Sequence, residues 1–419
     1  MTEKLEDLDS ILFQSSCEAL PPAKKTFLEA KWEEIRSIAV QNAGFGLWGS
    51  HLLKLTRDQI NQLQSKFKET IRSIEEGHLH LEDSFVLQHP ELIGLRFLID
   101  PSSEAYNQLF VEGNAKAFFW EYDPKLVARH RAHFQEVFKF LYHHPIWKAR
   151  DNLVSEMLVG NLISLLPYFD FENNSKIQIL RFIDNEWKLV YYQIQHIPLV
   201  HGEIYAYGLL PIDEPQAHPI LIFRGTPYPA AKGFLEAIWS DLHPIKSIGE
   251  EIFKKGKNEL DLWMDGKPKV ECYGLSLGGA MAYHAGHAYG HQIDVHAYAS
   301  PGLVPMKGGM SKIHGRVFFH LQDLIRSIGY HPVSDHFEIY AVIADCDLNF
   351  ITAHSCPIGL GPTLVLKIDP LHDNKTWTRY LANIVKIVVS TILFLILLPI
   401  KLCYKIVEKI KQLSFFSSS

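Results

Sequence analysis

Cysteine is scarce in this chain of 419 residues, and its five cysteines follow no regular spacing. A secreted disulfide framework is normally denser and built from an even number of cysteines, so we expect reduced thiols in a reducing compartment. The N-terminus is acidic and has no apolar core. It therefore predicts no secretory signal peptide.

A strong excess of one charge is also missing. The chain has 41 Lys and Arg against 47 Asp and Glu, a net charge of -6. This balance gives no electrostatic reason to expect a nucleic-acid partner. No phosphate-binding loop is present, and no dinucleotide-type glycine pattern follows a strand, so we expect no cofactor. His284, His287 and His291 share a helix face, but we expect polar or capping roles for them rather than a metal site.

The periodicity of apolar residues divides the chain into three regions. Residues 1–170 are expected to be mainly helical, because a capping-box pattern at 56–59 is followed by apolar residues at helical spacing from 60 to 74. Residues 171–378 begin with alternating strands around a turn at 184–186 and continue with short apolar strands separated by helix-length segments. This order predicts an α/β domain with a mostly parallel, helix-covered sheet and an antiparallel edge.

Residues 379–419 form the third region. The run 387–400 has no charged residue, and four lysines follow it at positions 401, 405, 409 and 411. A membrane span needs about 20 apolar residues, so the run is short unless it extends back past Lys386. We expect a C-terminal membrane anchor whose basic tail suits anionic headgroups, with a buried core helix as the alternative.

The sequence Gly274-Leu275-Ser276-Leu277-Gly278 is the main candidate for chemistry. It follows an apolar strand and precedes a stretch rich in small residues that is typical of a helix start. A strand, a sharp turn and a helix together present a nucleophilic serine at a helix N-terminus, where free N–H groups stabilise an oxyanion. Ser276 is therefore the predicted nucleophile. An ordinary N-cap serine is the alternative reading.

A second oxyanion donor is expected from an earlier loop. The apolar strand 220–223 ends in Phe-Arg-Gly-Thr at 223–226, and Trp239-Ser240-Asp241 follows. On these motifs the chain resembles the class 3 lipases, the fungal triacylglycerol lipase-like family of α/β-hydrolases. The resemblance covers about residues 218–356 and implies that Thr226 and the backbone N–H of Leu277 form the oxyanion hole. The family usually has His before the nucleophile, where this chain has Leu275.

The acid and the base of a triad should follow the serine in the order Asp, His. Asp323 comes just after the apolar strand 316–320 and matches the family's Asp-Ile-Val motif; Asp335, Asp345 and Asp347 are the competitors. That order leaves His331, His336, His354 and His372 as candidate bases. The resemblance makes His336, in the segment 330–340, non-catalytic. It favours His354 as the base, with His336 and then His372 as alternatives.

The predicted function is hydrolysis of carboxylic esters, with lipid esters as the expected class, through an acyl-enzyme on Ser276. Acyl transfer to an acceptor other than water shares the same first step. The alternative is a membrane-tethered interaction protein whose hydrolase fold has lost its activity. The sequence does not specify an oligomeric state.

Overall fold

A computed structural model describes residues 152–200, 203–226, 246–304, 310–320, 323, 325–344 and 363–368. It also describes residues 49–50, 55–56, 131, 137–139, 141–143, 354, 379, 381, 383–388 and 391. The expected helix around 60–74 and the run 392–400 lie outside the described residues, as do Asp241 and His372.

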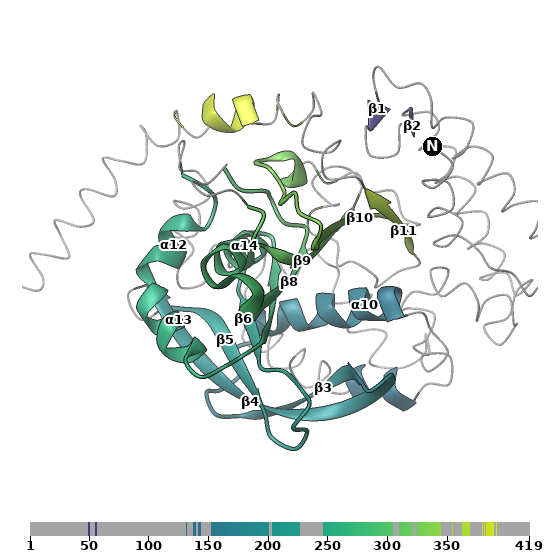
Figure 1. Cartoon of the computed structure of the whole chain (residues 1–419), viewed down its shortest axis with the longest axis vertical. Helices are drawn as coiled ribbons and strands as arrows, with labels where there is room; N and C mark the ends of the chain where they lie inside the picture. Colours follow the sequence, from purple (N-terminus) through teal and green to yellow (C-terminus); the bar gives the residue numbers. More distant parts are fainter. Residues whose placement is uncertain are drawn as a thin grey trace, which may run out of the picture.

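One mixed sheet forms the centre of the described part of the chain (Figure 1). Its strands lie in the order β11-β10-β9-β8-β7-β6-β5-β4-β3. Their bounds are β3 Lys176–Ile183, β4 Glu186–Val200, β5 Glu203–Pro211, β6 Ile220–Phe223, β7 Val270–Leu275, β8 Ile293–Tyr298, β9 His314–His320, β10 Phe337–Ala344 and β11 Thr363–Ile368. The expected α/β character is confirmed.

The balance of strand directions differs from the prediction of a mostly parallel sheet. Strands β6 to β10 pair in parallel, whereas β3 to β6 and the pair β10 and β11 are antiparallel. The sheet is therefore evenly mixed among its described strands. The antiparallel edge formed by β3 to β5 agrees with the prediction. Strand β11, which returns along β10 and adds a second antiparallel edge, was not expected from the sequence.

The turn between β3 and β4 shows why the first hairpin forms. Asp184 and Asn185 have φ angles of 55° and 63°, and Ile183 pairs with Glu186 across the two-residue loop. Two positive φ angles give the turn a twist that matches the twist of the strands, and Asn and Asp tolerate this conformation better than other non-glycine residues. The local sequence therefore specifies the register of the hairpin.

Helices cover both faces of the sheet. On one face lie α12 (Glu250–Lys255), α13 (Lys257–Met264) and α14 (Leu277–Tyr289), and α10 (Asn152–Leu165) packs on the other (Figure 1). The described part of the chain also contains the short helices η4 (Leu166–Tyr168), η5 (Gly290–Gln292) and η6 (Ile325–Ser327) and the paired strands β1 (Gly49–Ser50) and β2 (Leu55–Thr56). Although α10 falls within the region 1–170, it packs directly against β7 and β3.

The two faces of the parallel strands differ in chemistry because side chains alternate along a strand. The face beneath α14 carries small and aliphatic side chains such as Cys272, Val295 and Ala297, which pack in one cluster with α12 and α13. The face beneath α10 instead carries stacked aromatic rings: Phe318 of β9 stacks on Tyr298 of β8 and on Tyr340 of β10.

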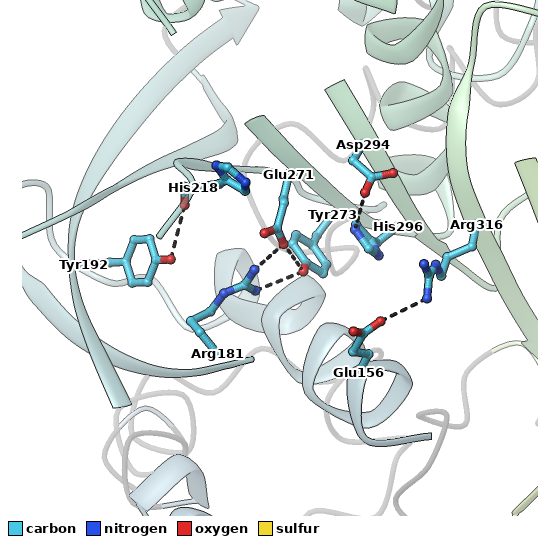
Figure 2. Close-up of polar contacts among 9 residues, drawn as sticks. All are labelled: Glu156, Arg181, Tyr192, His218, Glu271, Tyr273, Asp294, His296 and Arg316. Atoms are coloured by element: carbon cyan, nitrogen blue, oxygen red, sulfur yellow. Dashed lines mark hydrogen bonds and ion pairs between the residues drawn. The ribbon is translucent and has the colours of Figure 1, made fainter. Parts of the chain in front are cut away.

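Charged side chains occupy the amino-terminal part of the face beneath α10 (Figure 2). Arg181 of β3 forms an ion pair with Glu271 of β7, and both contact the hydroxyl of Tyr273. A second pair joins Arg316 of β9 to Glu156 of α10 at 3.0 Å. Charges this close to a core must be paired to be tolerated, and here the pairs link β3 and α10 to the central strands.

Candidate active site

Ser276 stands at the sharp turn between β7 and α14. Its backbone has φ 54° and ψ -121°, a strained conformation for a residue with a side chain. The amide of Ser276 donates to the carbonyl of Tyr298 at 2.9 Å, and its own carbonyl accepts the first helical bond, from Ala280 at 3.2 Å. These bonds tie the turn to the neighbouring strand β8 and to the helix, and so hold the serine in place.

The glycines around the serine are required by close contacts between backbone segments. A Cβ at Gly274 would lie 2.2 Å from the carbonyl oxygen of Gly278, and a Cβ at Gly278 would lie 2.2 Å from that of Phe223. Any side chain at either position would force these segments apart. The Gly-x-Ser-x-Gly spacing therefore allows both the tight turn and the approach of β6 to the start of α14.

The segment that follows β6 passes next to the serine turn. A Cβ at Gly225 would lie 2.6 Å from the carbonyl oxygen of Leu275 and 2.2 Å from the hydroxyl of Tyr168 in η4. Thr226 is the next residue along the chain, and Leu277 is the first residue of α14. The two residues predicted to supply oxyanion donors thus belong to segments that pack against each other beside Ser276.

The imidazole of His354 lies between Ser276 and Asp323. Its Nε2 is 2.8 Å from the Oγ of Ser276, and its Nδ1 is 3.0 Å from Oδ2 of Asp323. An ionised carboxylate can only accept, so Nδ1 carries a proton in this arrangement and Nε2 accepts the hydrogen bond from the serine hydroxyl. The side chain of Asp323 is fully buried, whereas that of His354 is 24% exposed.

Asp323 is held by its own backbone turn after β9. Its amide donates to the carbonyl of His320 at 2.9 Å, and its Oδ1 accepts from the amide of Ile325 at 2.9 Å. Both carboxylate oxygens are therefore engaged, one by the backbone and one by His354. A carboxylate fixed in this way has little freedom to rotate away from the imidazole.

A buried histidine that the sequence offered only as a possible base connects the acid turn to α14. Nδ1 of His331 is 3.1 Å from the hydroxyl of Tyr283, and its Nε2 is 3.2 Å from the carbonyl of Arg326 in η6. His331 also stacks on Phe319, over which the Arg326 guanidinium lies at 4.7 Å. No sequence pattern indicated this link, because its partners are brought together only by the fold.

The other candidates lie elsewhere. His336 is exposed in the turn before β10 and stacks on His314 at the amino-terminal end of β9, away from the carboxyl end of β7 where Ser276 stands. Asp335 is exposed in the same turn. Asp345 and Asp347 lie outside the described residues. His284 is buried beside Phe253, with its Nε2 3.0 Å from the carbonyl of Ile248.

Among the described residues, no group of three His, Cys, Asp or Glu side chains is placed to hold a metal ion. Within the same residues, no helix is both long and apolar enough to cross a membrane.

Comparison with known proteins gave no match: neither the models of known families, nor curated proteins, nor solved structures match the chain. The resemblance to the class 3 lipases therefore depends on the motifs at 223–226, 274–278 and around Asp323.

Proposed function

We propose that the protein is a serine hydrolase that cleaves carboxylic esters through an acyl-enzyme. The observation that supports this most strongly is the chain of hydrogen bonds from Ser276 through His354 to Asp323, with distances of 2.8 and 3.0 Å. A serine bonded to an imidazole that is itself oriented by a buried carboxylate is the arrangement that activates a hydroxyl for nucleophilic attack.

In the first step, Ser276 Oγ attacks the ester carbonyl while Nε2 of His354 takes the hydroxyl proton. Asp323 holds the imidazole in the required tautomer and stabilises its charged form. The backbone N–H of Leu277 and a donor from Thr226 receive the negative oxygen of the tetrahedral intermediate. His354 then protonates the leaving alkoxide, which departs as an alcohol and leaves the acyl group on Ser276.

In the second step, water attacks the acyl-enzyme. His354 takes a proton from the water, the acid is released and the serine regains its proton. An alcohol in place of water would give acyl transfer by the same route. The proposal requires no cofactor and no metal.

The topology supports the same reading at the level of the fold. Ser276 follows β7, Asp323 follows β9 and His354 follows β10, so serine, acid and base come in the chain order of the α/β-hydrolases. We therefore propose an α/β-hydrolase-type arrangement similar to that of the class 3 lipases. Leu275 remains a departure from that family's motif. It is buried and pairs with Tyr298 of β8, which suits a packing role.

Lipid esters are the proposed substrate class. The support is the uncharged run 387–400 with its basic tail, which would keep the site near a bilayer. The attacked carbonyl is the same in a lipid ester and in a soluble ester, so a soluble ester would be cleaved at Ser276 by the same steps.

Labelling with a fluorophosphonate probe tests the reaction, because the probe modifies only an activated serine. Wild-type protein should be labelled, and so should Ser175→Ala, which removes a serine from the turn before β3, four strands from β7 in the sheet. Ser276→Ala should not be labelled. An unlabelled wild type would favour the inactive interaction protein. Persistent labelling of Ser276→Ala would assign the reactivity to another serine.

A further inference from the structure

The C-terminal helical segment, described at residues 379, 381, 383–388 and 391, directs Arg379, Asn383 and Lys386 toward the protein body. Thr391 is exposed on the outward side, where its hydroxyl donates to the carbonyl of Ile387 within the helix. Arg379 is 1% exposed and donates to the carbonyl of Gly329 at 2.7 Å. The amide of Gly329 in turn donates to Oδ1 of Asn383 at 2.7 Å. One turn further, Lys386 approaches the carbonyl of Lys246 at 3.4 Å.

The apolar side chains of the same segment face outward. Five large ones are each about half exposed: Leu381 48%, Ile384 45%, Val385 50%, Ile387 51% and Val388 52%. At 3.6 residues per turn, positions 379, 383 and 386 fall within an arc of about 60°, and the five apolar positions lie around the opposite side. A helix on the surface of a water-soluble protein has the reverse arrangement.

We propose that this outward face, formed by the five apolar side chains, rests on a lipid bilayer. The inference goes beyond the proposed reaction and does not depend on it. An apolar face is stable when its surroundings are apolar, and the chain continues from this face into the uncharged run that ends at residue 400. The four lysines beyond that run add a charge suited to anionic headgroups.

The contacts of the segment also define which side of the protein would meet the lipid. Gly329 lies two residues after η6, and Tyr330 beside it pairs with Leu303 in the turn that follows β8. Asp323 precedes η6, so the hydrogen bonds of the segment to Gly329 lie close in the chain to the acid of the site. Figure 1 shows the segment, in yellow, next to η6. A bilayer contacting this helix would face the edge of the sheet that carries Ser276.

Depth-dependent fluorescence quenching tests the proposal without reference to activity. Val385→Trp is made in the full chain in a Trp377→Phe background, and Leu262→Trp in the same background is the matched control. Leu262 lies on α13 and is 74% exposed. Each protein is mixed with vesicles of phosphatidylcholine and phosphatidylserine, with and without brominated acyl chains.

With vesicles, the emission of Val385→Trp should shift to the blue and lose intensity to the brominated lipid, relative to the Trp377→Phe parent. Leu262→Trp should show neither change. The proposal is overturned if the protein does not bind the vesicles or if the tryptophan introduced by Val385→Trp keeps a water-like emission when bound. It is equally overturned if the blue shift occurs without vesicles. A shift that grows with protein concentration would indicate that a second copy covers the apolar face. A shift that is the same at every protein concentration would indicate that another part of the chain covers it. Because Ser276→Ala can be used throughout, failure here is distinct from failure of the proposed reaction.

Discussion

The Nε2 atom of His354 lies 2.8 Å from the Oγ atom of Ser276, although 78 residues separate the two along the chain. The contact arises because parallel strands present their carboxyl ends at one edge of the sheet. Ser276 directly follows β7, and His354 comes after β10.

Replacing Asp323 by Asn should reduce kcat for a soluble p-nitrophenyl ester by roughly 10⁴-fold with little change in KM, because the wrong tautomer of His354 would face Ser276. The fold should survive, since Asn can still accept from the amide of Ile325. Steady-state kinetics together with circular dichroism check this. A folded variant whose kcat stays within about tenfold of wild type would argue against Asp323 as the orienting acid.

Replacing Gly278 by Ala should displace the end of β6 from the start of α14. The added Cβ would lie 2.2 Å from the carbonyl oxygen of Phe223, so backbone must move where Thr226 and Leu277 are proposed to bind the oxyanion. A loss of roughly 10²-fold in kcat is expected. Gly266→Ala is the control: its φ is +71°, but nothing lies within 4 Å, so only backbone strain of about 1 kcal/mol is expected. Similar activity losses in both variants would contradict this account.

Replacing Glu271 by Gln should destabilise the protein and change its response to acid. Burial raises the pKa of Glu271, but the Arg181 guanidinium, His296 and the Tyr273 hydroxyl outweigh burial and hold the pKa at about 2. A lowered carboxyl pKa contributes stability above the unfolded value of 4.5 that is lost as pH falls toward 2. The free energy of unfolding at pH 7 should drop by about 3 kcal/mol, because Arg181 is left buried without its partner.

Urea unfolding at a series of pH values measures this effect. Between pH 4.5 and 2 the wild type should lose stability more steeply than Glu271→Gln. Glu186→Gln is the matched control, since Glu186 pairs with Lys188 at 3.5 Å but is 66% exposed. Equal pH dependence in wild type and Glu271→Gln would contradict the prediction.

His284 should make the protein less stable as the pH falls below neutrality. Its burial lowers the pKa from 6.5 to about 4, against the opposing effects of the Ile248 carbonyl and Glu250. The unfolded chain therefore takes up a proton between pH 6.5 and 4 that the folded chain excludes, and stability decreases by an amount on the order of 3 kcal/mol. In His284→Asn the urea midpoint of unfolding should change less with pH across this window than it does in the wild type. In the control His336→Asn, which replaces an exposed histidine, the change of the midpoint with pH should equal that of the wild type. A slope that persists in His284→Asn would assign it to another group.

The local sequence determined the strands and the serine turn. Alternating apolar residues specify β3 and β4, the pair Asp184 and Asn185 suits the tight turn between them, and Gly274 and Gly278 permit the sharp turn at Ser276. These features depend on residues that are close in the chain and on the backbone conformations that each residue type allows. Both can be inferred from the sequence.

Tertiary structure decided what depends on distant segments. Only the packed fold distinguishes the two candidate bases: His354 is hydrogen-bonded to Ser276, whereas His336 stacks on His314 at the other end of the strands. The antiparallel return of β11, the link from His331 to Tyr283 and the outward apolar face of the C-terminal helical segment have the same origin. Each depends on which side chains approach through space, and spacing along the chain does not encode that.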